Sequence, residues 1–271
     1  MKKNKSVLLS APYIIFMVIF TLIPLGVVGF YALTDPDTGA FSLRNIRELG
    51  MYMPVLWQSI LYSLVSAFIC LLLGYPVAYY IAQCKPITQK LLYMLVMLPM
   101  CMSFLLRTLA WVGLLQDTGI INNFLDWIGI GRIRMIRTPG AVILGMVYNY
   151  LPYMILPLYA TIVKIDKRLI EAAEDLGCNG VQTFQKVTLP LSMPGILSGI
   201  TMVFVPAVST FYISQKLGGT DTVLIGDVIE RLFKQGTNAN LGAALSLVLM
   251  ALVFVCTGIM NRFGGDEEVI V

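Results

Sequence analysis

The residues of this chain that could do chemistry are few, and their types do not suit catalysis. Among the 271 residues there is no histidine, so the commonest general base and metal ligand is missing. The five cysteines form no Cys-x-x-Cys pair, and neither a Gly-x-x-x-x-Gly-Lys-Ser/Thr phosphate loop nor a Gly-x-Ser-x-Gly elbow occurs. We therefore expect a chain that is not an enzyme, holds no cofactor or metal and contains no disulfide.

The charged residues are confined to segments that separate long uncharged stretches. Only 13% of the residues are charged, against roughly 25% in soluble domains, and 58% are apolar. The uncharged stretches cover residues 6–34, 49–84, 91–106, 138–163, 187–215 and 235–261, and all but the third exceed the ~20 residues that a helix needs to cross a bilayer. This pattern predicts an all-α, polytopic membrane protein with six transmembrane helices in one domain, residues 1–271. Its first span is expected at 7–33 and its core at 57–262.

The third stretch is the shortest; it is interrupted by a charge, Arg107, after which the uncharged run resumes from Thr108 to Gln116. A straight helix of about 16 residues would place Arg107 ~24 Å from Lys90, near the far membrane surface. The side chain could then be an interfacial anchor that extends to the headgroups, or a charge that serves the transport path. The depth along a straight helix favours the anchor.

The basic residues predict how the chain is oriented in the membrane. Lys2, Lys3 and Lys5 precede the first stretch with no acidic residue among them, and that stretch is too long for the apolar part of a cleaved signal peptide. Basic segments stay in the cytoplasm, and six spans return the chain to the side on which it started. We expect both termini on the cytoplasmic side of the cell membrane.

No aspartate or glutamate lies in the six apolar stretches. Transporters driven by a proton or sodium gradient usually need such groups near the middle of the membrane. A self-sufficient secondary carrier is therefore the weaker alternative. Energy for transport is expected to come from a partner.

The segment from 164 to 195, between the fourth and fifth stretches, predicts a helix, a turn and a second helix on the cytoplasmic side. Asp166 can cap the first helix, and Gly177 suits the left-handed position after its end. The apolar residues follow i, i+3, i+4, i+7 spacing, at Leu169, Ala172, Ala173 and Leu176. Asn179-Gly180 marks the turn.

The same segment carries a long motif. Glu171-Ala172-Ala173, then three residues to Gly177, then nine residues to Val187-Thr188-Leu189-Pro190, resembles the EAA loop of ABC importer permeases, with Val187 where isoleucine is usual. Within that family the chain looks most like the PotB-type permeases of spermidine/putrescine importers. The stretches that carry this resemblance are Leu72 to Pro76, Gly145 to Tyr148, Leu156 to Tyr159, Leu189 to Gly195, Gly218-Gly219 and Leu224 to Gly226.

This resemblance implies a type I importer permease with the MetI-like fold. The cytoplasmic EAA loop, residues 164–195, would be its coupling loop, and the residues implied to contact the ATP-binding subunit are Glu171, Ala172, Ala173, Asp175, Gly177, Leu189 and Pro190. The implied partners are a second, PotC-like permease, two copies of a PotA-like ATP-binding subunit and an extracytoplasmic PotD-like polyamine-binding protein. The remaining expected partner is membrane lipid; nucleic acid is not expected, because no basic stripe with interleaved aromatic residues occurs.

Polyamine passage through spans without carboxylates would depend on aromatic faces, which attract cations by ~0.5–2 kcal/mol each. The candidates in the fourth and fifth spans are Tyr148, Tyr153, Phe204, Phe211 and Tyr212, with Tyr148 and Phe211 preferred. Packing of the same rings against lipid or neighbouring helices is the competing interpretation. On the outer side, Asp221, Asp227 and Glu230 could attract a polycation or receive the binding protein.

Substrate is the open question within the importer hypothesis, because permeases for iron chelates, opines, sulfate or thiamine share this loop and the six-span plan. A membrane assembly factor without transport is a further alternative, which the EAA motif disfavours. The sequence alone does not distinguish the preferred polyamine or the pore-lining residues.

Overall fold

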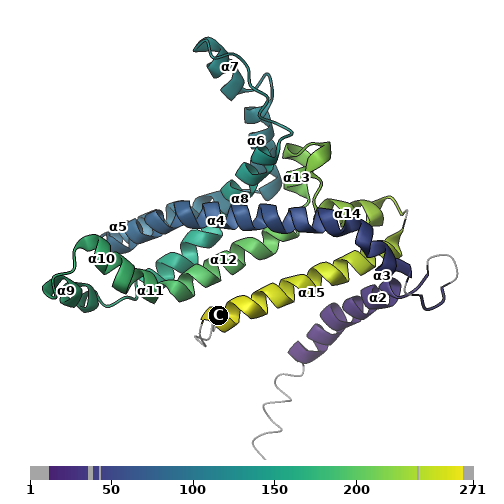
Figure 1. Cartoon of the computed structure of the whole chain (residues 1–271), viewed down its shortest axis with the longest axis horizontal. Coiled ribbons are helices and arrows are strands. Elements are labelled where there is room, and N and C mark those ends of the chain that lie inside the picture. Colours follow the sequence, from purple (N-terminus) through teal and green to yellow (C-terminus); the bar gives the residue numbers. More distant parts are fainter. Residues whose placement is uncertain (1–11, 36–38, 43, 237, 265–271) are drawn as a thin grey trace, which may run out of the picture. The chain divides into compact units, whose positions relative to one another are not determined.

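The computed structural model describes residues 12–35, 39–42, 44–236 and 238–264, and this part of the chain is almost entirely helical (Figure 1). It contains no strand beyond an isolated bridge between Thr34 and Phe41. The α-helices are α2 (Ile23–Ala32), α3 (Arg44–Glu48), α4 (Met53–Gln83), α5 (Pro86–Met97), α6 (Phe104–Leu115), α7 (Ile120–Trp127), α8 (Pro139–Ile162), α9 (Lys167–Asp175), α10 (Gly180–Thr183), α11 (Leu189–Leu191), α12 (Met193–Val208), α13 (Tyr212–Leu217), α14 (Ile225–Lys234) and α15 (Ala239–Gly264). The all-α prediction is confirmed.

The chain forms two compact units. The first unit comprises the described residues up to Pro54 together with Val228–Leu252, and the second comprises Val55–Asp227 and the described residues from Val253 onward. In the first unit, Asn45 and Asn240 both donate side-chain hydrogen bonds to the carbonyl oxygen of Thr34, at 2.9 and 2.6 Å. These bonds fasten α3 and the start of α15 to the end of α2. The second unit carries the predicted coupling loop and the part of the predicted core from residue 57 to Asp227.

Apolar helices long enough to cross a membrane overlap all six predicted stretches, although the third such helix begins only near the end of the stretch 91–106. The described residues contain five, Pro12–Ala32, Arg44–Gln83, Phe104–Trp127, Pro139–Ile162 and Ala239–Met260, or six if the bent pair Gly180–Leu191 and Met193–Val208 is a single span. The pair is bent by 62°. The number of spans therefore agrees with the prediction, although two of them are not straight helices.

The third predicted span is broken in the middle. An apolar helix covers Pro86–Cys101, and α6 begins only at Phe104, because Met102 and Ser103 adopt extended backbone angles. Pro99 lies in the last turn before the break and cannot donate a backbone hydrogen bond. The fifth span is likewise interrupted between α12 and α13, at residues 209–211. The straight helix from which the depth of Arg107 was estimated is therefore wrong for the third span.

Two wider, π-helical segments also have a proline nearby. Val18–Leu22 ends two residues before Pro24, and Phe184–Thr188 ends two residues before Pro190. A proline leaves the carbonyl four residues earlier without its usual N–H partner, and the backbone widens to find another. Hydropathy alone does not indicate this form of distortion.

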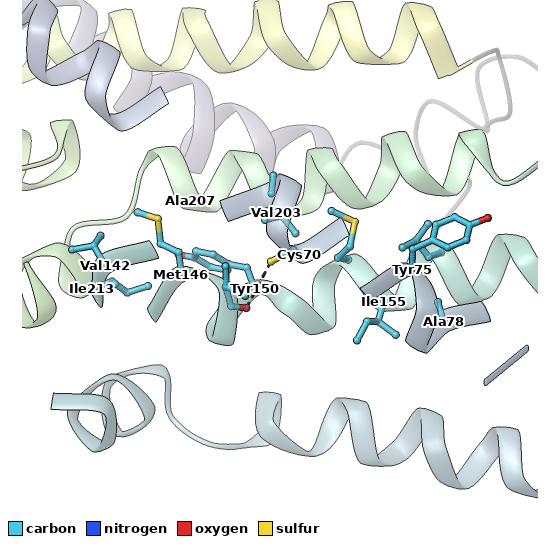
Figure 2. Packing of buried hydrophobic residues seen from close by; sticks show 14 of the residues in the cluster. Cys70, Tyr75, Ala78, Val142, Met146, Tyr150, Ile155, Val203, Ala207 and Ile213 are labelled. Carbon is cyan, nitrogen blue, oxygen red and sulfur yellow. Dashed lines mark hydrogen bonds between the residues drawn. The ribbon is translucent and has the colours of Figure 1, made fainter. Parts of the chain in front are cut away.

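The core of the second unit is centred on α8. Met146, Met154 and Leu158 are fully buried there, and Figure 2 shows Met146 and Tyr150 of α8 beside Val203 and Ala207 of α12. The two helices approach closely because α12 has small residues at the contact. A Cβ atom at Gly199 would lie 2.6 Å from the sulfur of Met154. Helix α8 is therefore the central, closely packed helix of the unit.

Candidate functional site

The coupling loop predicted from sequence is a helix, a turn and a second helix. Asp166 caps α9, its carboxylate accepting the backbone N–H of Arg168 at 3.0 Å, and Gly177 ends it with a φ of +85°. Asn179 and Gln182 then form a reciprocal capping box at the start of α10. Each of these termini is specified by local chemistry, so the prediction of caps and turn is confirmed.

The apolar residues of α9 face two ways. Ala173 is buried against the unit, whereas Leu169 and Ala172 are exposed and Leu176 keeps 86% of its surface accessible. Leu169, Ala172 and Leu176 share one face of the helix at i, i+3 and i+7 spacing; we call them the exposed stripe. A leucine with so little cover, beside two other apolar residues on a charged helix, is typical of a surface that another protein covers.

Aromatic contacts fasten the loop to the rest of the unit. The ring of Phe184 meets Tyr75 and Tyr79 of α4 edge-on, at centroid distances of 5.5 and 5.8 Å. The hydroxyl of Tyr75 shares a 2.8 Å hydrogen bond with Ser192, at the 62° bend that leads into α12. A displacement of the loop would therefore be passed to α4 and α12 together. Tyr75, Tyr79 and Phe184 were not among the predicted site residues, although Tyr75 and Tyr79 stand at helical i, i+4 spacing.

A pocket of 240 Å³ separates α9 from the ends of α4 and α8. Its walls include Gln83, Ile162 and Ile170, with Lys167 and Glu171 contributing the charged groups. Of the predicted coupling residues, Glu171 thus lies at the junction of helix and pocket, while Ala172, Asp175 and Gly177 are exposed. Leu189 is half-buried against the core and Pro190 is exposed.

The predicted aromatic path residues do not form one cluster. Tyr148 packs edge-on against Trp111 of α6, at 5.4 Å, whereas Tyr153 contacts Tyr150 on its own helix, at 6.3 Å. Phe204 is only 3% exposed and belongs to the packed interior. Tyr148, Tyr153 and Phe211 are each exposed on about two fifths of their surface.

Tyr212 already has a cation on its ring. The ammonium of Lys216, one turn later on α13, lies 5.7 Å from the ring centroid, and Phe104 of α6 packs on the same ring at 6.2 Å. An incoming ammonium group would compete with that lysine. The assignment of Tyr148, Tyr153, Phe204, Phe211 and Tyr212 to the path stays a prediction, and exposure does not separate Tyr148 and Phe211 from Tyr153.

Arg107 lies inside the second unit. Its side chain is 7% exposed. Within the described residues its Nε and Nη1 atoms have no hydrogen-bond partner. A guanidinium buried in the unit does not fit the anchor interpretation, and the break at Met102 and Ser103 removes the straight helix from which the anchor was inferred.

The three acidic residues predicted at the outer mouth have individual roles. Asp227 is 9% exposed, and its carboxylate accepts the backbone N–H of Leu224 at 2.9 Å, which caps α14. Glu230 forms an ion pair with Lys234 at 2.5 Å. The backbone carbonyl of Asp221 accepts a hydrogen bond from Gln58 at 2.9 Å. Attraction of a polycation by these residues remains a prediction.

Among the described residues, no group of three cysteine, aspartate or glutamate side chains could hold a metal ion. All five cysteines are free, and Cys70 is buried in the core. What the second unit displays instead is the helix α9 with its exposed stripe, in a loop that Phe184 attaches to α4 through ring contacts.

Comparison with known families and proteins agrees with this architecture. Residues 6–264 match the family described as binding-protein-dependent transport system inner membrane component. The chain is similar to the spermidine/putrescine transport system permease protein PotB of Escherichia coli, with 39% identity over 86% of this chain and 88% of that protein. It is also similar to PotB of Haemophilus influenzae, with 40% identity over 88% and 87% of the two chains.

Solved structures show the same fold. A chain of a bacterial ABC transporter involved in the import of the acidic polysaccharide alginate superposes with a TM-score of 0.77 and 21% identity, over 98% of this chain and 97% of that one. A chain of the MetNI methionine ABC transporter superposes with a TM-score of 0.61 and 18% identity, over 80% of this chain and 96% of that one. The predicted MetI-like permease fold is confirmed.

Proposed function

Because the chain belongs to the family of binding-protein-dependent transport system inner membrane components, we propose that it is the permease subunit of an ATP-driven importer of spermidine and putrescine. It works in the cytoplasmic membrane, with both termini and the EAA loop inside the cell. ATP is hydrolysed by two PotA-like subunits. A PotC-like permease completes the pore, and a PotD-like binding protein delivers the polyamine.

The observation that carries this proposal is the exposed stripe on α9. Leu169, Ala172 and Leu176 offer an apolar contact to the ATP-binding subunit, and Glu171, beside the pocket, adds a charge at its edge. The permease alternates between inward-facing and outward-facing states, and closure of the ATP-binding pair shifts the balance between them. Movement of α9 reaches the bundle through Phe184, Tyr75 and Ser192.

The substrate follows from the relatives, which are about 39% identical and bear the spermidine/putrescine name. The second unit suits a substrate of this kind, because Tyr148 and Phe211 present partly exposed aromatic faces. Weak cation–π contacts in series allow a polycation to pass without being trapped.

The test is uptake in cells that lack every other polyamine importer. The complete transporter is expressed with or without this chain, and the import of radiolabelled spermidine and putrescine is measured. We expect uptake only when the chain is present, with competition by unlabelled polyamine and none by sulfate, thiamine, opines or iron chelates. Uptake that persists without the chain would contradict the proposed function. Competition by one of the other compounds would show that this compound, and not a polyamine, is the substrate.

A further inference from the structure

A second pocket, of 670 Å³, lies at the opposite end of α8 from the coupling helix. It is bounded by the end of α6, the turn at Asp117-Thr118, the segment that leads into α8 and the helix α13. The pocket beside α9 includes Ile162, the last residue of α8, whereas this one includes Arg137, two residues before its first. A helix of 24 residues is about 36 Å long, so the two pockets lie on opposite sides of a membrane. We call the second one the outer pocket.

The outer pocket is strongly cationic. Arg134, Arg137 and Lys216 line it, against a single acidic residue, Asp117. All four side chains are exposed, and within the described residues none of the four forms an ion pair. Positive groups that converge on one polar cavity raise the local concentration of anions and repel cations.

The backbone that presents Arg137 is held in an unusual conformation. Its φ is +59°, in the left-handed region that side chains other than glycine and asparagine rarely adopt. Its N–H donates to the carbonyl of Leu217 at 2.9 Å, and a Cβ atom on Gly219 would lie 2.9 Å from its carbonyl oxygen. The next residue, Thr138, donates to Met135 at 2.7 Å and caps α8. An unfavourable backbone conformation that neighbouring residues stabilise is typical of a functional residue, such as one that contacts a ligand or a partner.

A cationic pocket is a poor place for a polycation to enter, so it is not the substrate path of the importer proposed above. We propose that the outer pocket is the docking site for an acidic surface loop of the extracytoplasmic binding protein. The inference rests on the proposed function, which supplies both the orientation and the partner. Opposite charges steer the loaded binding protein to the permease, while free polyamine is kept away from the contact.

The charges of the pocket favour a protein loop over a single small anion. The three basic side chains come from two separate segments around a cavity of 670 Å³, which is far larger than one carboxylate. Arginine and lysine on different walls match several acidic side chains in a fixed arrangement. From charge alone, we expect an acidic patch on the partner.

The test uses the complete transporter, reconstituted in lipid, and its binding protein. The concentration of binding protein that gives half-maximal stimulation of ATP hydrolysis is measured at low and high salt. Two variants remove charge independently: Arg134→Glu, and Arg137→Gly, which also relieves the backbone and so protects the fold. The control is Arg132→Glu in the same segment, whose side chain pairs with Asp126 at 3.5 Å and is not part of the pocket.

We expect each pocket variant to raise the half-maximal concentration by roughly tenfold, with a weaker dependence on salt, and to approach the wild-type rate at saturating binding protein. The control should change it less than about twofold. An unchanged half-maximal concentration in both pocket variants would overturn the docking site while leaving polyamine import intact. A variant effect that appears only when anionic lipid is present would overturn it in favour of lipid headgroups. A wild-type complex that its binding protein does not stimulate would overturn both this inference and the proposed function.

Discussion

The two ends of α8 differ in how their surfaces are built. At the Ile162 end, the coupling loop is one continuous segment whose caps, turn and exposed stripe all lie between residues 164 and 195. At the Pro139 end, the outer pocket joins the end of α6, the segment before α8 and the helix α13, which are far apart along the chain. A surface made from one segment can be predicted from the sequence. A surface made from three segments can be identified only once the fold shows that the segments lie together.

The largest expected effect concerns the exposed stripe at the Ile162 end. Replacing Leu169 and Leu176 together by aspartate places charge in the proposed interface, and we expect binding of the ATP-binding subunit to weaken by at least about 30-fold. Ile87→Asp is the control, because Ile87 is exposed in the first turn of α5 and is not on α9. Co-purification of the subunit with each variant measures the effect. Equal recovery from the stripe variant and the control would contradict the assignment.

The next prediction compares packing at the two ends with one kind of substitution. A Cβ atom at Gly226, in the first turn of α14, would lie 2.5 Å from the carbonyl oxygen of Thr210, and one at Gly180, the first residue of α10, would meet nothing within 4 Å. We expect Gly226→Ala to lower the free energy of unfolding by about 1–3 kcal/mol and Gly180→Ala to leave it nearly unchanged. Thermal unfolding in detergent is the measurement. Similar melting temperatures for the two variants would contradict the close packing of Gly226 against Thr210.

Arg107, between the two ends, should show opposite effects on stability and transport. Removing a buried charge without a partner in the described residues by Arg107→Leu should stabilise the isolated chain by up to about 3 kcal/mol. If the charge is kept for a partner in the assembled importer, the same variant should lower polyamine uptake, and Arg107→Lys should restore part of it. Uptake that equals the wild type in the leucine variant would show that the charge has no transport role.

The smallest expected effect concerns the aromatic faces. Tyr148→Leu combined with Phe211→Leu removes two partly exposed rings, and a loss of ~0.5–2 kcal/mol each corresponds to a decrease in uptake of roughly fivefold or more. The matched control is Tyr153→Leu, a ring of similar exposure outside the preferred pair. Normal uptake at normal expression in the double variant would show that the two rings pack against lipid or neighbouring helices and do not contact the substrate.

The features that sequence predicts here are those with local causes. Hydropathy is a property of contiguous residues, so the apolar spans could be located from the sequence. Helix capping depends on residues within three or four positions, so the ends of α9 could be predicted from Asp166 and Gly177. Hydropathy does not distinguish one straight helix from two halves joined by an extended pair. The breaks at Met102-Ser103 and at 209–211 were therefore missed.

The error in the position of Arg107 followed from the missed break, since its depth was counted along a helix that is not continuous. The outer pocket was beyond the reach of sequence for a different reason. Arg134 and Lys216 are 82 positions apart, and no local pattern marks them as neighbours. Sequence reasoning instead placed the outer charge on Asp221, Asp227 and Glu230, because these three lie close together along the chain.

The most direct test of the account is ATP-driven spermidine uptake by the reconstituted transporter that carries Glu171→Arg and Gly177→Arg. The first change reverses the charge beside the α9 pocket, and the second puts a large side chain at a φ of +85°. Glu174→Arg, the same charge change on the same helix but at one of the three unspecified positions of the motif, serves as the control. The account predicts uptake at the level seen without ATP for the double variant and near-normal uptake for the control. Full coupled uptake by the double variant would contradict it.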